Sequence, residues 1–411
     1  MIDLKQKEHR NTLFLYLVVF IGFLMFGFSE NIKGPALPRM QSDFMIGEME
    51  VGILLALNSA GYLLACSFTG FLSRKLGLKR TSLLAFGSMT LAGFLILFSV
   101  SFTQFTASYF LMYIGNGMLE IGLGILSARI FTKNTGRMMN MAHFFYGLSS
   151  TAGPVLATFL MGRKLFGSPI GWRGMYCAVL VLCVIPMLPA FFSRFPDSNE
   201  QSENSQTGRD YLRDPVAWLT ILILSFGVVS ELSIGGWLAN FLEKVYRWTP
   251  DASAGLLSAF FLFFTLGRLI LGSLTDKIGF VKSLILFSSF SGVMSIAGVI
   301  AGEKGAFLFA LAGLGIAPIY PTVMAFLAKR YQKGTDMAVS ITVTLMGIGS
   351  VLGNFMVGAV IDLFKSIFSA SGKALVLGLQ AGYLFIGLCA LICAFISLLL
   401  YNHLVKAKEN I

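Results

Sequence analysis

Charged residues are scarce in this sequence of 411 residues, because Asp, Glu, Lys and Arg together make up only 12% of it. In an ordinary soluble domain they make up about a quarter. Apolar residues account for 56% of the chain, which includes 39 Phe, and the mean hydropathy is +0.78. This composition excludes an ordinary soluble globular domain and indicates a chain whose solvent is lipid.

Residues for covalent and metal chemistry are also few. The chain has no GxxxxGK[ST] phosphate-binding motif, so ATP-driven chemistry has no support in it. None of the three His has a companion His or Cys at metal-ligand spacing, and we expect neither a metal nor a cofactor. The five Cys all fall in apolar segments, form no CxxC pair and are best explained by packing: Cys66, Cys177, Cys183, Cys389 and Cys393.

Long apolar segments are abundant. A run of 18 or more mostly apolar residues is long enough to cross a bilayer as a helix. The sequence predicts an all-α membrane protein with twelve such spans, at about 12–36, 49–72, 81–101, 103–131, 138–162, 173–193, 216–240, 252–275, 280–302, 304–329, 337–363 and 377–401.

The basic residues predict the orientation of these spans. With an even number of spans both termini lie on one side of the membrane, and 20 of the 31 Lys and Arg fall on that side. Nine fall on the other side, and Lys33 and Arg268 lie within spans. Because Lys and Arg concentrate in cytoplasmic loops, we expect a protein of the plasma membrane with both termini in the cytoplasm. The net charge of +11 therefore reports orientation and not a nucleic-acid partner.

One long polar interval, 194–215, divides the spans six and six. It is rich in Ser, Asn and Gln and has Pro near both ends, which predicts a flexible cytoplasmic linker. We therefore expect an N-terminal six-helix bundle at 1–193, the linker at 194–215 and a C-terminal six-helix bundle at 216–411.

The two halves resemble each other. Residues 70–80 (GFLSRKLGLKR) and 272–282 (GSLTDKIGFVK) are short basic turns with Gly at matching offsets, each between the second and third span of its half. Twelve spans built as two parallel repeats are an architecture of secondary transporters, whose substrate site lies near the bilayer midplane between the repeats.

On these turns the chain resembles the major facilitator superfamily along its full length. In that family the signature is associated with a gate on the cytoplasmic side, a role that the resemblance assigns here to Arg268, Gly272 and Asp276. The first copy departs from the pattern, because Arg74 stands where the signature has an acid.

Two Glu residues lie in apolar runs of similar sequence, Glu30 at the end of FGFSE and Glu231 at the end of FGVVSE. A carboxylate at bilayer depth costs several kcal/mol, about 2.5 to 3.5 for a central Asp on insertion scales. Lys33 lies three residues after Glu30, on a neighbouring position of one helix face. Gly34 and Pro35 can bend the helix there, at a polar cavity. Alternatively, Lys33 extends to the outer interface and Glu30 merely pairs with it.

A third carboxyl, Glu120, lies well inside the span 103–131, with Asn116 four residues before it on the same face. Because no basic residue lies within a turn, Glu120 suits a protonation site. The alternative is a protonated Glu that bonds between helices. In the next span Asn140, His143, Tyr146 and Ser150 follow helical spacing; His143 either contacts substrate or serves as a structural hydrogen bonder.

In the seventh span Glu231 precedes Gly235, Gly236, Trp237 and Asn240. Trp237 lies about 240° around a regular helix from Glu231, so local unwinding at the two Gly is needed to bring both to one cavity. An indole offers an apolar face for a sugar ring and one N–H donor. The alternative places Trp237 in the interfacial aromatic belt.

These segments resemble the fucose:proton symporter family and its glucose-transporting relatives. The residues 116–120 are similar to a motif whose Glu takes part in proton coupling, and 140–147 and 231–237 resemble two further motifs. One departure is clear: the family carries an acid four residues before its first-span Pro, and the position four before Pro38 is Gly34. Either Glu30 and Lys33 supply this chemistry or the coupling differs.

Together these observations favour secondary symport of a small polar solute, most simply a monosaccharide, with H⁺ (or Na⁺), by a monomer in the lipid of the plasma membrane. Proton-coupled efflux of amphipathic drugs is the first alternative; for a receptor or an enzyme the chain shows neither a signalling domain nor a base with a nucleophile. The expected proton-coupling residues are Glu120, Glu30 and Glu231. The expected solute-binding residues are Lys33, Asn31, Asn116, His143, Tyr146, Trp237, Asn240 and Asn354.

Overall fold

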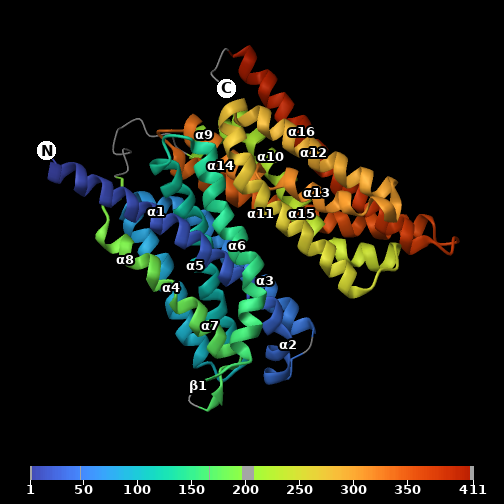
Figure 1. Cartoon of the computed structure of the whole chain (residues 1–411), viewed down its shortest axis with the longest axis horizontal. Helices are drawn as coiled ribbons and strands as arrows, with labels where there is room; N and C mark the ends of the chain where they lie inside the picture. The colour runs from blue at the N-terminus through green and yellow to red at the C-terminus, as the bar shows by residue number, and fades with distance from the viewer. Residues whose placement is uncertain (1, 47, 166, 197–207, 408–411) are drawn as a thin grey trace. The chain divides into compact units, whose positions relative to one another are not determined.

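The computed structural model describes residues 2–46, 48–165, 167–196 and 208–407, which are almost entirely helical (Figure 1). A two-stranded antiparallel hairpin pairs Lys164 with Pro169 and Leu165 with Ser168. The elements are, in order, α1 (Ile2–Asn31), α2 (Lys33–Phe44), α3 (Glu48–Leu76), α4 (Leu78–Leu97), α5 (Phe102–Ile130), α6 (Thr135–Met161), β1 (Lys164–Leu165), β2 (Ser168–Pro169), α7 (Gly171–Val181), α8 (Val184–Phe192), α9 (Gly208–Arg213), α10 (Pro215–Val245), α11 (Pro250–Ile278), α12 (Phe280–Ile300), the 3₁₀ helix η2 (Gly302–Gly305), α13 (Phe307–Ile316), α14 (Ile319–Arg330), α15 (Thr335–Ile367) and α16 (Ala374–Lys406).

The predicted all-α membrane fold is confirmed. Among the described residues, eleven helical segments are long and apolar enough to cross a membrane, and each coincides with a predicted span. The remaining predicted span, 49–72, falls within α3, where several side chains are outside the described set.

Local sequence explains where the long helices begin. Ser101 accepts a hydrogen bond from the Gln104 amide before α5, Asp214 from the Val216 amide before α10, and Thr249 from the Ala252 amide before α11. Such caps satisfy amides that have no partner inside the helix. Pro follows the cap directly in α10 and α11, at the helical position where its missing N–H costs nothing.

Two predicted spans contain a break. The first divides at Ile32 into α1 and α2, which leaves Pro35 in the first turn of α2, where Pro is tolerated. The tenth divides at Ala317 and Pro318 into α13 and α14, where Pro318 and Pro321 cannot donate helical hydrogen bonds. By contrast, α10 runs without interruption from Pro215 to Val245, so the unwinding expected at Gly235 and Gly236 does not occur. Two helical Gly in the middle of a long apolar segment weaken a helix without opening it.

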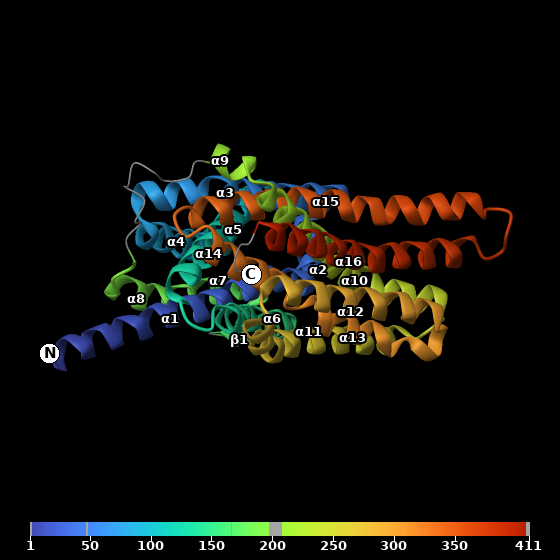
Figure 2. The same cartoon turned by 90° about the horizontal axis from the view of Figure 1, so that it is seen from above.

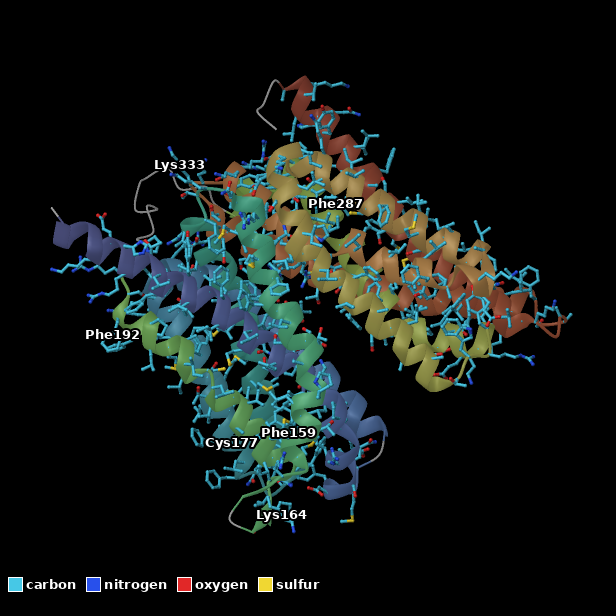
Figure 3. All side chains as sticks on the ribbon, in the orientation of Figure 1. Phe159, Lys164, Cys177, Phe192, Phe287 and Lys333 are labelled. Carbon is cyan, nitrogen blue, oxygen red and sulfur yellow. The ribbon has the colours of Figure 1, made fainter. Side chains whose placement is uncertain are left out.

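The chain forms two compact units. Unit 1 comprises residues 1–132, 145–207 and 331–341. Its helices α3 and α4 pack along α5, and α4 also packs along α7 (Figure 1). Close approach depends on glycine: a Cβ at Gly117 of α5 would lie 2.5 Å from the Tyr62 carbonyl oxygen of α3, and one at Gly61 of α3 would lie 3.0 Å from the Phe110 ring. Lys164 on the hairpin and Lys333 before α15 lie at opposite ends of this unit (Figure 3).

Unit 2 comprises residues 133–144, 208–330 and 342–411. Its helices α12 and α10 both pack against α16, and α11 packs against α13 (Figure 2). The contact between α12 and α16 is close because Gly292 faces Gly387, where an added Cβ would lie 2.9 Å from the carbonyl oxygen.

The predicted bundles at 1–193 and 216–411 remain a prediction, since each unit also includes a short segment from the other half of the chain, 133–144 or 331–341. Of the predicted linker, 197–207 lies outside the described residues. Its last part forms the short helix α9, which Tyr211 attaches to α15 through a hydrogen bond of 2.6 Å to Thr342. Burial raises the pKa of Tyr211 above its usual range, so the phenol stays protonated.

Candidate functional site

In unit 1, Glu30 at the end of α1 and Lys33 at the start of α2 form an ion pair. The Lys33 Nζ also donates to the Tyr113 hydroxyl of α5 at 3.1 Å and lies 5.5 Å from the centre of that ring. The side chains of Glu30 and Lys33 are 26% and 32% exposed. The helix break at Ile32 therefore sets a charge pair, and not a lone carboxylate, inside the first span.

Asn116 extends this cluster. Its Nδ2 lies 3.5 Å from Glu30 Oε2, and its Oδ1 accepts a hydrogen bond of 2.7 Å from Ser29. Asn31 bonds elsewhere, from its Nδ2 to the Gly27 carbonyl oxygen at 2.8 Å and to Ser150 of α6 at 3.0 Å. The polar residues of α1 and α5 are thus engaged with one another, as buried polar groups must be in a membrane.

Glu120 lies one turn after Asn116 and is 8% exposed. The Tyr62 hydroxyl of α3 donates a hydrogen bond to Glu120 Oε2. Gly117 permits this contact, because the missing side chain lets the α3 backbone approach α5 at Tyr62. A phenol can donate to a carboxylate and accept from a carboxylic acid, so this pair can persist in both protonation states of Glu120.

In unit 2, Glu231 of α10 faces Arg268 of α11, with 3.6 Å between Oε1 and Nη2. Arg268 is 3% exposed, lies 4.1 Å from the centre of the Phe264 ring, and donates from Nη1 to the His143 carbonyl oxygen at 3.2 Å. The sequence near Glu231 offers no cation. The folded chain supplies one from the next helix.

The break in the tenth span has a direct role in holding Arg268. The carbonyl oxygen of Ala317 would normally accept from the amide four residues later, but that residue is Pro321, which has no N–H. Arg268 Nε donates to this oxygen instead, at 3.1 Å. His143 lies close by, with its ring centre 5.0 Å from that of Tyr320 in α14.

Other predicted solute-binding residues are placed apart from these clusters. Because α10 is continuous, Trp237 does not meet Glu231; it lines an apolar crevice with no room for a water molecule, together with Phe241, Val357 and Tyr383. Asn240 is exposed. The side chain of Asn354 lies outside the described residues.

The α6 residues are divided between the two units. Tyr146 belongs to unit 1, where its ring centre lies 5.0 Å from that of Phe26, and Ser150 bonds to Asn31 there. Asn140 and His143 belong to unit 2, where Asn140 donates to the Gly136 carbonyl oxygen at 2.9 Å.

The three residues expected to form a gate lie in two separate contacts of unit 2. Arg268 pairs with Glu231, as described above. Asp276, at the end of α11, accepts hydrogen bonds from the backbone amides of Gly136 and Arg137, at 2.7 and 2.8 Å, and so caps the start of α6. Gly272 lets the two helices approach, because a Cβ there would lie 2.7 Å from the Asn140 Cβ.

Sequence reasoning missed a corresponding cluster in unit 1. Asp336 in the first turn of α15 is fully buried and accepts two hydrogen bonds of 2.7 Å from Arg129 Nη2 and one of 2.8 Å from Ser73. A signal for it was present: residues 128–136 and 328–336 share Ala, Lys and Thr at matching positions, which places Arg129 and Asp336 in equivalent parts of the two halves. No comparable sequence pattern indicated that Tyr62 and Tyr113 would contact the predicted carboxyl groups.

A helical fold of membrane-spanning segments with ion pairs inside the spans is typical of a polytopic transporter, since charges at this depth mark solute or ion pathways. The family model of the Major Facilitator Superfamily matches residues 19–303 and 231–410, and the chain belongs to this family. It is accordingly a transporter and not an enzyme.

Relatives with full-length similarity are distant. The chain is 20% identical to the Protein TsgA homolog of Buchnera aphidicola over 363 residues, which cover 88% of this chain and 91% of that protein. It is 25% identical to an uncharacterized MFS-type transporter of Yersinia pestis, over 84% of this chain and 88% of the relative.

Two solved structures share the fold. The E. coli fucose:proton symporter FucP matches with a TM-score of 0.75 at 17% identity, over 94% of this chain and 98% of FucP. The proton:xylose symporter XylE matches with a TM-score of 0.74 at 12% identity, over 94% of each chain. At these identities the likeness establishes the fold alone.

Proposed function

We propose that this transporter carries a small polar solute, most simply a monosaccharide, together with a proton into the cell. Transport proceeds by alternating access, in which the solute site opens to one side of the membrane at a time. The symport of sugars by FucP and XylE supports this proposal by analogy. The contact between Glu120 and Tyr62 carries it.

Glu120 is the proposed site of proton binding. Its Oε2 accepts a hydrogen bond from the neutral Tyr62 phenol, whereas Glu30 and Glu231 each face a cation. A cation stabilises the charged form of a carboxyl group, whereas a phenol can bond to both the carboxylate and the carboxylic acid. Glu30 and Glu231 are proposed as secondary members of the coupling.

The charged side chains that pair inside the spans of each unit neutralise one another, which favours an uncharged solute. Glu30 with Lys33, and Glu231 with Arg268, are pairs of opposite charge inside the spans. Once Glu120 is protonated, these groups carry no net charge, so they attract neither an organic cation nor an anion strongly. A sugar instead needs donors and acceptors, which Asn116, Asn31 and Tyr113 offer.

We further propose that the protein works as a monomer in the plasma membrane with both termini in the cytoplasm. The distribution of Lys and Arg supports this orientation. Lys33, Asn31, Asn116, His143 and Tyr146 remain proposed solute-binding residues. Trp237 and Asn240 remain weaker members of that set, because no contact observed among the described residues joins them to the two ion pairs. Asn354, whose side chain lies outside the described residues, also stays in the proposed set.

The test is uptake of labelled hexoses and pentoses into membrane vesicles, with and without an inward proton gradient. The proposal predicts accumulation of at least one sugar above equilibrium only when the gradient is present. A parallel series with an inward Na⁺ gradient distinguishes the coupling ion.

Two results would contradict the proposal. One is the absence of gradient-driven accumulation of any sugar. The other is gradient-driven extrusion of a lipophilic dye, which would favour efflux of amphipathic compounds instead. Vesicles without the transporter serve as the control for passive permeation.

A further inference from the structure

The second of the two repeated turns (residues 272–282) contacts the start of α6. In this contact a carboxylate accepts hydrogen bonds from backbone amides. Asp276 receives the amides of Gly136 and Arg137 at the start of α6. A Cβ at Gly136 would lie 2.9 Å from Asp276 Oδ1, so a side chain there would displace the carboxylate. An acid on the turn and a glycine on the helix are therefore complementary.

The first signature turn makes the corresponding contact with α15, and here the residues are reversed. Arg74 stands where the acid would be, and the second residue of α15 is Asp336 where α6 has Gly136. Ser73 on the turn bonds to the Asp336 carboxylate at 2.8 Å, and Arg129 binds both of its oxygens.

The two contacts are otherwise closely alike. A Cβ at Gly70 would lie 2.7 Å from the Ser340 Cβ, as one at Gly272 would lie 2.7 Å from the Asn140 Cβ. Ser340 lies four residues after Asp336, and Asn140 lies four residues after Gly136, the two helix positions that differ. Ser340 also donates to the Cys66 carbonyl oxygen of α3 at 2.6 Å.

We propose that Asp336 replaces the acid that the first turn lacks, so that the acid has moved across the contact from the turn to the helix, and that Arg129 and Ser73 hold α15 against α3 through it. Asp336 and Arg129 are thereby positioning residues, whose contact opens and closes once in each transport cycle. The contact itself rests on observed bonds; only its part in the cycle rests on the proposed function.

Because of this exchange, the two contacts depend on different chemical groups. The contact of Asp276 uses backbone amides of α6 and needs no side chain from that helix as a partner. The contact of Asp336 depends on a cation from α5 that also donates to the Pro196 carbonyl oxygen at 3.2 Å. Removing one partner of a buried ion pair leaves the other charge without compensation, which is more costly than never having the pair.

The test is to remove the acid from position 336 of α15 and restore one at position 74 of the turn. In a background with the five native Cys replaced by Ala and Ser340→Cys introduced, the rate of maleimide labelling at position 340 reports opening of the contact. Asp336→Gly is expected to raise this rate by about tenfold, which corresponds to ~1.4 kcal/mol. The double variant Arg74→Asp with Asp336→Gly recreates the arrangement of the second turn and is expected to return the rate most of the way to that of the parent.

The matched control is Arg74→Leu with Asp336→Gly, which removes the same two side chains without adding a carboxylate and is expected to label as fast as Asp336→Gly alone. Asp336→Asn, which keeps the shape, is expected to label at an intermediate rate and serves if Asp336→Gly does not fold. Melting temperatures in detergent identify unfolded variants. Rescue by Arg74→Asp supports the exchange, and equal labelling of the two double variants overturns it.

The role in the cycle has a separate readout. Sugar counterflow by Asp336→Gly should be slowed and should recover in the double variant with Arg74→Asp. If labelling is rescued while no variant, including the parent, transports a sugar, the exchange of the acid stands and the proposed solute is wrong. Rescue of labelling with unchanged counterflow in Asp336→Gly would show that the contact does not limit the cycle.

Discussion

A carboxyl group inside a membrane span needs hydrogen-bond partners, and Tyr62 supplies one for Glu120. The phenol can remain bonded while the proton comes and goes, so the protein does not have to bury an uncompensated charge during the cycle. The position of the pair between α3 and α5 follows from Gly117, which lets the two backbones approach.

Glu120→Gln should abolish accumulation of sugar above equilibrium and leave counterflow intact. The amide keeps the shape and can accept from Tyr62, but it cannot carry a proton. Accumulation and counterflow are measured in the same vesicles, with Tyr62→Phe as a milder variant in which accumulation is reduced and not lost. Unchanged accumulation by Glu120→Gln would remove this residue from the coupling role.

The pair of Glu231 and Arg268 should show strong coupling in a double-mutant cycle. Arg268→Met alone leaves Glu231 without its cation and the Ala317 carbonyl oxygen without its donor, so we expect a loss of about 3–5 kcal/mol in the free energy of unfolding. The double variant with Glu231→Gln should lose less. Stability is measured by unfolding in detergent; additive losses would mean that the two side chains do not interact.

Residue pairs were predictable from sequence only where the two residues are a few positions apart along the chain. Glu30 and Lys33 are three residues apart, and they do form an ion pair. Tyr62 and Glu120 are 58 residues apart, and Arg129 and Asp336 are 207 apart, so their contacts depend on how separate helices pack. No local period encodes such a partner.

At the scale of the elements, glycines decide which helices approach closely. Gly117→Ala should lower the melting temperature, because the new Cβ would lie 2.5 Å from the Tyr62 carbonyl oxygen and α3 would have to move. Overpacking of this kind costs about 1–3 kcal/mol.

Gly87→Ala in α4 is the matched control for that prediction. A Cβ there has no atom within 4 Å, so the same substitution should be neutral or slightly stabilising through helix propensity. Equal effects at the two positions would contradict the close approach of α3 and α5.

The break between α13 and α14 should matter for transport more than for folding. Pro321→Ala restores an amide that can bond to the Ala317 carbonyl oxygen and compete with Arg268. We expect an unchanged or higher melting temperature together with slower counterflow. Pro189→Ala, which restores an amide within α8, is the control and should leave counterflow unchanged.

The long elements were predictable because a bilayer demands apolar segments of a fixed minimal length. The breaks within the helices were less predictable. Pro318 and Pro321 lie at the break between α13 and α14, since Pro removes a helical hydrogen bond, whereas Gly235 and Gly236 do not unwind α10. Gly lowers helix propensity by only about 1 kcal/mol, which the surrounding apolar residues of a membrane span readily outweigh.

For the whole molecule, the proposed orientation is testable in unit 1, where Lys164 and Lys333 are exposed at opposite ends (Figure 3). In intact cells carrying the variant without native Cys, Lys164→Cys should react with a membrane-impermeant maleimide. Lys333→Cys should react only after the membrane is permeabilised. The reverse pattern would contradict the orientation that the basic residues predict.

The class of the whole molecule was predictable because composition, span number and the repeated turns all depend on the bilayer and on the internal repeat. The identity of the solute was not predictable to the same degree. A sugar is recognised by a few hydrogen bonds whose geometry depends on several helices, and no short motif of this chain fixes that geometry.

The most direct test of proton-coupled symport is to record external pH while a transported sugar is added to vesicles that contain the purified protein and no ion gradient. If transport is symport, sugar entry removes protons from the medium, so that the external pH rises, and Glu120→Gln lets sugar equilibrate with no change in pH. Sugar entry by the unaltered protein without proton uptake, or with proton release, would contradict it.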